Sequence, residues 1–186
     1  SLLEKSRRKE SLNGIIVSVS ASSLASNSRD EIIEEGRHLR RRIDELMRLF
    51  DSRIPVYVLI TKCDQIYGFC DWAKALPPDA FRQAVGYTNA SSQIGKSADL
   101  LDKAFDNIVD RTEDLRLVIS RQLGLNEAIL TFPNELAKLK PALEHFFEGA
   151  FQDTPYLDSP LVRGIYLSSA EQDDAEFPNF FNNETK

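Results

Sequence analysis

Lys62 and Asp64 stand two positions apart, directly after Thr61 and an apolar run. A carboxylate accepts two hydrogen bonds side by side, and guanine offers a matching pair of donors in N1–H and its exocyclic amino group. Adenine presents an acceptor at N1 instead, so a carboxylate disfavours it, and a lysine stem can lie flat over a purine ring. Thr61, Lys62 and Asp64 therefore predict a site that reads a guanine base. The alternative is that Lys62 and Asp64 only cap the strand and the following helix.

The apolar run before these residues, 54–60, predicts the strand that positions them. Pro55 stands near its start, where a missing backbone N–H is tolerated. A near-continuous apolar run is typical of a parallel strand that is covered on both faces of its sheet. Ligands of open α/β sheets bind beyond the carboxyl ends of the strands, which is where Asp64 falls. Cys63 is expected to point back into the core.

Two more strands are predicted, over residues 13–20 and 161–169. The first is a short β-branched run, and Gly164 in the second indicates a bulge or a close approach of another backbone. Ser169 and Ala170 end the second run, where a Ser-Ala turn in a GTPase-like sheet would present a backbone N–H to the base. The alternative for this turn is an ordinary polar loop.

A helix is expected between the first two strands. Ser28 and Glu31 have the spacing of a capping box, and apolar residues recur every three or four positions to about Phe50. A strand, a helix and a strand in this order predict parallel strands. Four arginines lie mainly off the apolar stripe of the helix: Arg37, Arg40, Arg41 and Arg42. We interpret them as a solvated face paired with glutamates one turn earlier, and the alternative is a site for anions.

Most of the remaining residues show helical periodicity. The predicted helical segments are 68–76, 79–86 with a break at 86–89, 97–123 and 132–151. Gly124 is expected to cap the third of these segments, and Pro141 is expected to kink or interrupt the last.

Together these elements predict an α/β fold with a three-stranded parallel sheet, part of a GTPase-like, P-loop-type fold, and a large inserted helical lobe. The expected division is 1–78 for the βαβ portion, 79–160 for the helical lobe, 161–172 for the third strand and 173–186 for a polar tail.

The composition argues against several other classes. Of the 186 residues, 42% are hydrophobic and 28% are charged, as in ordinary globular proteins, and the net charge of −6 disfavours nucleic-acid binding. No apolar run approaches the roughly 20 residues of a membrane span. Cys63 and Cys70 fit neither a CxxC nor a zinc pattern. His38 and His145 stand alone, so we predict neither a metal site nor a Ser/His/Asp catalytic set.

The sequence lacks the G-x-x-x-x-G-K-[ST] phosphate loop. Its closest approximation is Gly95-Lys96-Ser97, but no strand is predicted before it, and the preceding Gly86 lies nine positions before Gly95 instead of five. Without a phosphate cradle and a Mg²⁺ site, this chain is not expected to hydrolyse nucleotide. We expect no cofactor in these residues, and a nucleotide, GTP or ATP, only in the full-length protein.

Segments along nearly the whole chain resemble, in order, the cytoplasmic NTPase-like region of the IcmF/TssM family. They are residues 12–18, 55–64 with Gly68-Phe69, 84–87, 132–139 and 161–172. Within them, P-V-Y-x-L-x-T-K-C-D and L-x-R-G-x-Y-x-x-S-x-x-Q are the most specific patterns when they occur together.

The resemblance implies a structural or interaction domain at the cytoplasmic face of the bacterial inner membrane, in a type VI secretion system. It implies partners among the membrane-complex proteins, including TssL and TssJ, and the baseplate proteins, with membrane anchoring through segments outside this chain. Many family members carry a phosphate loop upstream, and this chain starts after it. By the same resemblance, Thr61, Lys62 and Asp64 would read the base and Ser169-Ala170 would support them.

Two other functions stay open. One is a GTPase or ATPase that is active only with the missing upstream half, and the other is a small α/β adaptor without a nucleotide role. Without an upstream strand beside it, Asn13–Ser20 would be an edge strand. We expect such an edge to be shielded by self-association or by residues 2–11.

Overall fold

The structure is a computed structural model that describes residues 12–76, 85–89, 97–152 and 160–169. Its elements are β1 (Ile15–Ser20), α2 (Ala21–Ser26), α3 (Arg29–Phe50), β2 (Pro55–Thr61), the 3-10 turn η1 (Cys63–Gln65), α4 (Phe69–Lys74), β3 (Gly86–Thr88), α5 (Ser97–Leu123), α6 (Glu127–Ala137), α7 (Lys140–Phe151) and β4 (Leu161–Leu167). The predictions of β1, α3, β2, α4, α5 and β4 are confirmed, with ends that differ by no more than two residues. Most of the helix expected at 79–86 lies outside the described residues, as do 2–11 and the tail 173–186.

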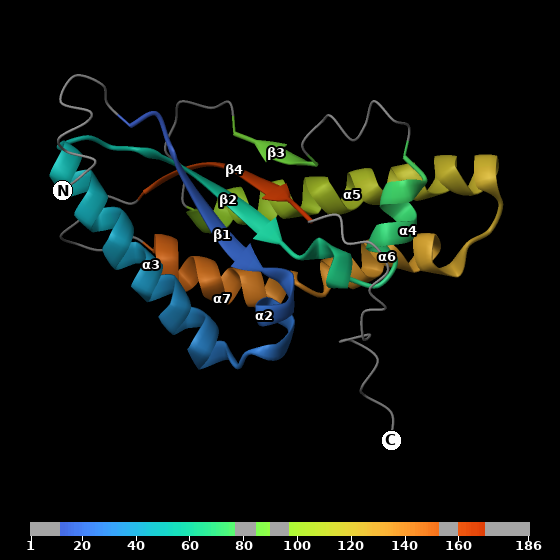
Figure 1. Cartoon of the computed structure of the whole chain (residues 1–186), viewed down its shortest axis with the longest axis horizontal. Coiled ribbons are helices and arrows are strands. Elements are labelled where there is room, and N and C mark those ends of the chain that lie inside the picture. The colour runs from blue at the N-terminus through green and yellow to red at the C-terminus, as the bar shows by residue number, and fades with distance from the viewer. Residues whose placement is uncertain (1–11, 77–84, 90–96, 153–159, 170–186) are drawn as a thin grey trace.

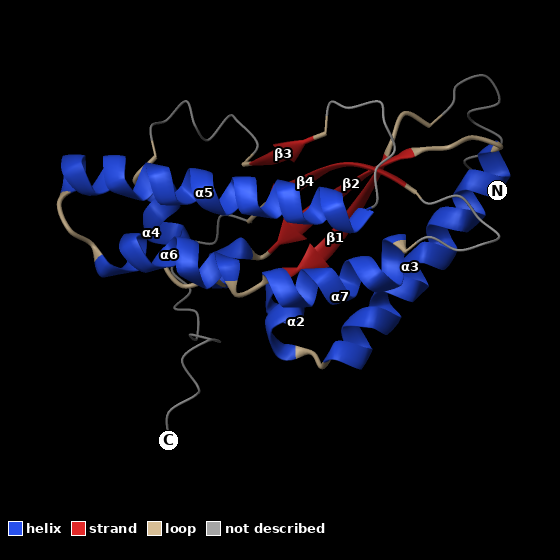
Figure 2. Cartoon of the chain, turned by 180° about the vertical axis from the view of Figure 1, so that it is seen from behind, coloured by secondary structure: helices blue, strands red, loops and turns tan. Residues whose placement is uncertain are grey.

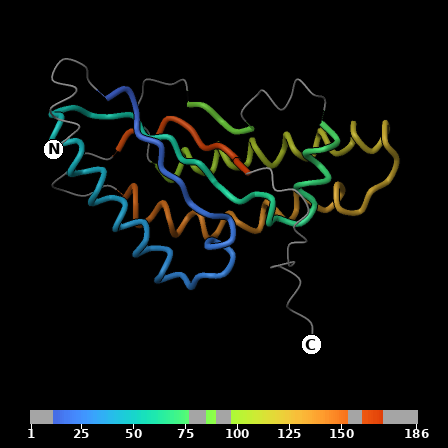
Figure 3. The backbone as a smooth tube through the Cα atoms, in the orientation of Figure 1, coloured from blue at the N-terminus to red at the C-terminus, as the bar shows by residue number. Residues whose placement is uncertain are grey.

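The sheet has four strands in the order β1-β2-β4-β3. β1, β2 and β4 are parallel, whereas β3 pairs antiparallel with β4. The three predicted strands are therefore present and parallel, as expected, but the prediction of a sheet of only these three missed β3 and its antiparallel pairing. Three residues are too few to show the alternation of a strand, and the segment 86–89 was expected only to break a helix. β4 lies between β2 and β3 although it comes last in the chain (Figure 3).

The irregularity expected at Gly164 is confirmed. The pairing of β2 with β4 shifts register between Val56 and Tyr57, and Gly164 stands opposite Tyr57. A Cβ atom on Gly164 would lie 2.7 Å from the ring of Tyr166 and 2.9 Å from the backbone carbonyl oxygen of Tyr87, so a side chain here would force its neighbours to shift. The missing side chain therefore leaves room for this ring to lie across the strand.

The long helices form a layer against one face of the sheet. α5 packs on β3 and β4, and α3 runs along α7. In Figure 1 the strands lie in front of α5 and α7, and in Figure 2, seen from behind, the same helices lie in front of the strands. The helices that were expected to form a lobe beside the sheet thus supply much of the core under it.

α3 and α7 approach closely at two glycines. A Cβ atom on Gly36 would lie 2.6 Å from the carbonyl oxygen of Phe146, and one on Gly149 would collide with the carbonyl oxygen of Ile33. Both obstacles are backbone atoms, which cannot rotate away. These glycines therefore permit the distance at which the two helices cross.

The sheet has one buried face and one face that the described residues cover only partly. Residues that point to the helices are buried in every parallel strand: Val17 and Val19 in β1, Val56, Val58 and Ile60 in β2, and Val162, Ile165 and Leu167 in β4. Their neighbours Tyr57 and Leu59 are only partly buried, and Ile16 is 73% exposed. The prediction that β2 is covered on both faces therefore holds only in part within the described residues, because its second face is partly buried. A continuous apolar run does not reveal whether both faces have partners.

The C-terminal helices begin elsewhere than predicted. α6 starts at Glu127 rather than at Phe132, because the side chain of Asn126 accepts hydrogen bonds from the backbone N–H groups of Ala128 and Ile129 at 2.9 and 3.3 Å. Pro141 lies in the first turn of α7, where a proline needs no hydrogen-bond partner for its nitrogen. It separates two helices and does not kink one.

Among the residues that the structure describes, no helix has both the length and the apolarity that crossing a membrane requires.

Candidate functional site

The predicted base-reading residues lie where β2 and β4 end side by side. Two backbone hydrogen bonds hold Ser168, just after β4, against the end of β2 and the turn that follows it. Ser168 N–H donates to the carbonyl of Ile60 at 2.7 Å, and Cys63 N–H donates to the carbonyl of Ser168 at 3.1 Å. Parallel pairing thus brings two segments that are distant in the sequence to one edge of the sheet.

Asp64 and Ser169 meet at this edge. The hydroxyl of Ser169 donates a hydrogen bond to the Oδ1 atom of Asp64, and both side chains are partly buried. The sequence predicted that both residues serve one site. It predicted, however, that a backbone N–H of Ser169-Ala170 would contact the base, and it did not predict a hydrogen bond from the Ser169 hydroxyl to Asp64. Ala170 lies outside the described residues. The hydrogen bond orients the carboxylate and occupies one of its oxygens.

Thr61 and Lys62 lie beside this pair in different roles. The Thr61 hydroxyl donates to the carbonyl of Val19 at 3.3 Å and so ties the end of β2 to β1. Lys62 is exposed and has a left-handed backbone, with φ 56° and ψ 37°. A non-glycine residue rarely adopts this conformation. It turns the chain sharply from β2 into η1, which holds Asp64.

Cys63 points into the core, as its sequence context predicted. Its thiol is buried and donates to the carbonyl of Ile60 at 3.2 Å. Burial raises the pKa of this thiol to about 12, against an opposing backbone hydrogen bond at Ser168 and with a smaller increase from the charge of Asp64. A thiol that stays neutral is a packing group here and not a nucleophile.

An aromatic cluster supports the edge from the helix side. Trp72 of α4 packs on Phe132 of α6, with 5.1 Å between ring centroids, and Phe69 lies 5.6 Å from the same ring, edge to face. Gly68, with φ 83°, lies so close to the carbonyl of Ala128 that no Cβ atom would fit. α6 therefore holds α4 in place and, through it, the turn that carries Asp64.

A cavity of about 520 Å³ lies between the start of α5 and the end of α7, and none of its lining residues belongs to this edge. Its lining includes three carboxylates, Asp102, Glu144 and Glu148. These charges repel phosphate, so the cavity does not complete a nucleotide site. The described residues contain no cluster of His, Cys, Asp and Glu that could hold a metal ion.

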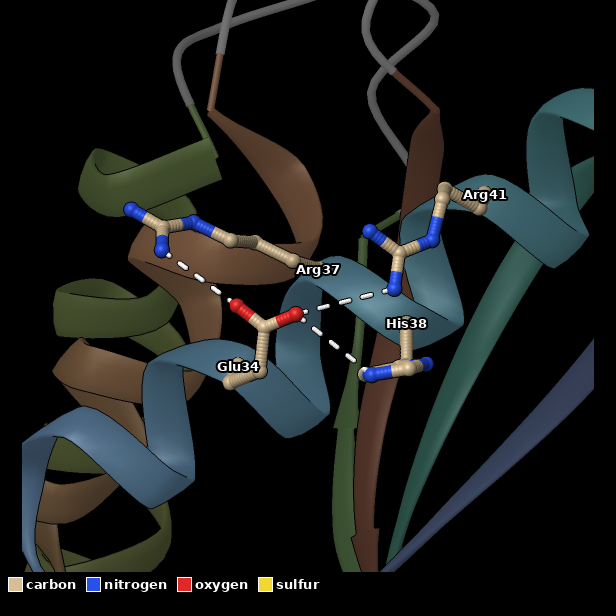
Figure 4. A network of polar contacts seen from close by, with 4 residues as sticks. All are labelled: Glu34, Arg37, His38 and Arg41. Carbon is tan, nitrogen blue, oxygen red and sulfur yellow. Dashed lines mark hydrogen bonds and ion pairs between the residues drawn. The ribbon is translucent and has the colours of Figure 1, made fainter.

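The arginines of α3 have two different environments. One carboxylate, that of Glu34, lies within 3.4 to 3.6 Å of Arg37, His38 and Arg41, and all of these side chains are largely exposed (Figure 4). This network agrees with the interpretation of a solvated face.

Arg40, in contrast, is buried, and its predicted place off the apolar stripe was wrong. Its guanidinium donates to Asp44 at 2.9 Å and to the carbonyl of Gln152 at 3.0 Å. It therefore fastens the end of α7 to α3.

The start of α3 has the predicted capping box, in which Ser28 N–H donates to Glu31 at 2.8 Å and lowers the pKa of that carboxyl.

Two comparisons with known proteins, one with a family model and one with a single relative, indicate the same family. A sequence model described as the IcmF-related N-terminal domain matches residues 1–185. The chain is 31% identical over 179 residues to the type VI secretion system component TssM1 of Pseudomonas aeruginosa, and the match covers 92% of this chain. It spans only 16% of the length of that relative. No solved structure matches the chain.

Proposed function

This chain belongs to the IcmF-related family, whose N-terminal domain it carries, and on that premise we propose that it is an interaction domain of a type VI secretion apparatus. It would act at the cytoplasmic face of the inner membrane and contact other membrane-complex and baseplate proteins. The membrane anchor would lie in parts of the longer protein outside these residues.

The observation that carries this proposal is the similarity to TssM1 over 92% of the chain. A match of this extent includes the core helices as well as the strand ends, so it concerns the whole domain and not one motif. The division into a βαβ portion, a helical lobe, a third strand and a tail stays a prediction.

We further propose that the edge formed by Asp64 and Ser169 is the base-reading half of a nucleotide site. The geometry that supports it is the oriented carboxylate at the ends of two parallel strands. Thr61 would act indirectly, by holding β2 on β1, and Lys62 would cover the ring of the base. Because most of a nucleotide's charge lies in its phosphates, binding to this half alone is expected to be weak.

Ligand-observed NMR with GDP and ADP tests the base site in the range where weak binding is measurable. We expect a dissociation constant weaker than about 1 mM, with GDP preferred over ADP. In Asp64→Asn, the amide would donate to the 2-carbonyl of xanthine, so the preference should move from GDP to XDP. Absence of any base preference would favour the adaptor alternative. Micromolar binding that Asp64→Ala abolishes would favour the GTPase alternative.

The interaction role is tested in the full-length protein. If the domain is structural, Asp64→Asn should leave copurification with other secretion components and secretion itself within about twofold of wild type. The variant for comparison is Phe132→Ala, which disrupts the fold instead of the base site. It removes the ring between α4 and α6 and is expected to destabilise the domain by about 3–5 kcal/mol. Loss of secretion in Asp64→Asn with intact copurification would instead indicate a nucleotide-dependent enzyme.

Self-association through β1 also stays a prediction. β1 is an edge strand of the described sheet and carries no charged residue between Ile15 and Ser20. Edges without charge or proline are prone to pair with a further strand. Light scattering of wild type and Ile16→Lys over a range of concentrations would detect such pairing.

A further inference from the structure

The second half of α5 extends beyond the sheet and ends in the turn to α6 (Figure 2). Apolar side chains are exposed along it. Leu117 is 56% exposed, Val118 50%, Leu123 67% and Leu125 87%. Exposed apolar residues that gather in one region, unlike single ones, are a mark of interaction surfaces.

Two of these residues lie on one face with a pair of opposite charges. Asp114, Leu117, Val118 and Arg121 follow one another at intervals of three, one and three residues, which places them together on a helix. All four are exposed, and the buried stripe of α5, with Leu101, Phe105 and Ile108, lies on its other side. Within the described part of the chain, neither Asp114 nor Arg121 forms an ion pair.

The order of these residues makes the face complementary to itself. Reading along α5, a carboxylate is followed by two apolar residues and then by a guanidinium, with the centre between Leu117 and Val118. A two-fold axis through this centre places Asp114 of one helix opposite Arg121 of the other, and does so twice. The two charges are about 10 Å apart along the axis, at 1.5 Å per residue.

We propose that two copies of this chain associate through an antiparallel contact of their α5 helices. Leu117 and Val118 of both copies form the apolar centre, and two Asp114–Arg121 ion pairs flank it. A self-complementary patch of this kind is what a two-fold dimer requires. A purely acidic or basic partner would satisfy only one of the two charges, which is why the second copy is the better fit.

The contact is small. It covers about two helical turns on each side, well below the roughly 800 Å² per partner that stable complexes bury. Association of the separate chain is therefore expected to be weak and visible only at high concentration, and to strengthen when copies are held together in a larger assembly. The inference does not depend on the nucleotide site or on the secretion role.

Charge reversal tests the register. Sedimentation equilibrium of the 186-residue chain is compared between about 10 µM and 1 mM for wild type, Asp114→Arg and Arg121→Asp. The average mass of wild type should rise with concentration. Each single variant should associate at least tenfold more weakly, because its dimer would place two like charges opposite each other twice. The double variant Asp114→Arg/Arg121→Asp should associate as wild type does.

Mixing the two single variants gives the sharpest result. The arginine introduced at position 114 of one variant then faces the aspartate introduced at position 121 of the other. At the second pair, the native Arg121 of the first variant faces the native Asp114 of the second. A mixed dimer should therefore form at concentrations at which neither variant alone associates appreciably.

Cross-linking tests the centre of the contact. A Val118→Cys variant in a Cys70→Ser background should form a disulfide dimer under oxidation, because the two copies of position 118 lie close to the two-fold axis. The matched control is Asn107→Cys in the same background, which is exposed on the same helix but lies farther from the axis and should not form one.

Three results would overturn the proposal. They are a mass that stays monomeric to 1 mM, association that survives in both single variants, and association that only Ile16→Lys abolishes, which would place the contact at β1. Unfolding curves serve as the control, since all the substituted residues of α5 are exposed and their variants should unfold within about 0.5 kcal/mol of wild type.

Discussion

At the scale of single residues, the orientation of the Asp64 carboxylate is set by a residue that is distant in the sequence. The Ser169 hydroxyl orients it and takes one of its oxygens. A guanine base needs two acceptors side by side, so a base at this edge must share the Asp64 carboxylate with Ser169. The proposed base site would therefore be more restricted than the Thr-Lys-Cys-Asp motif alone suggested.

Cys63 gives a prediction about stability at high pH. Its pKa is raised from 9.0 to about 12 by burial in the folded chain. Below pH 9 the thiol is neutral in both states and its contribution is fully present. As the pH rises from 9 toward 12, the thiol ionises only in the unfolded chain, and stability is lost.

Urea unfolding of wild type and Cys63→Ala at pH 8 and pH 10.5 measures this effect. Wild type should lose about 2 kcal/mol more than Cys63→Ala over this interval, which is the linkage expected for about 1.5 pH units above the unfolded pKa. Other groups titrate equally in both proteins and cancel in the comparison. An equal loss in the two proteins would show that Cys63 is accessible to solvent.

At the scale of elements, the contact between α3 and α7 depends on Gly36 and Gly149. Because a methyl group at Gly149 would collide with the carbonyl of Ile33, Gly149→Ala must push the helices apart. We expect a loss of about 1–3 kcal/mol, typical of an overpacked contact, although alanine favours the helix itself. Chemical denaturation measures the change.

The matched control is Glu144→Ala, on the exposed side of the same helix. It should change the free energy of unfolding by no more than about 0.5 kcal/mol. If Gly149→Ala were equally neutral, the two helices would lie farther apart than the structure places them.

At the scale of the whole molecule, the main feature is that one face of the sheet is only partly covered by the residues that the structure describes. Parallel sheets are usually covered on both sides, yet here Ile16 is 73% exposed and Tyr57 and Leu59 are partly exposed. The relative TssM1 is several times longer than this chain. Partners for this face would therefore come from outside the described residues.

Two neighbouring substitutions in β1 test which face is covered. Ile16→Thr should change the free energy of unfolding by about 0.5 kcal/mol or less, because the side chain is exposed. Val17→Thr places a hydroxyl in the buried face without a partner and should cost about 1–3 kcal/mol. Similar costs at the two positions, measured by thermal or urea unfolding, would mean that both faces are buried in solution.

The sequence by itself determined the features that depend on neighbours along the chain. Apolar periodicity located β2 and α5, the Ser28–Glu31 spacing located the start of α3, and the motif around Asp64 indicated the edge of the sheet at which a site would lie. Caps and periods act within a few residues, so a single sequence contains the information they need.

Only the tertiary structure decided the features that depend on distant segments. These are the pairing of β3 with β4, the burial of Arg40 against the end of α7, the partly covered face of the sheet, and the bond between Asp64 and Ser169, which are 105 residues apart. Each of them rests on which surfaces meet when the chain collapses. A three-residue strand, an arginine or an apolar run has the same local pattern whether or not a partner faces it.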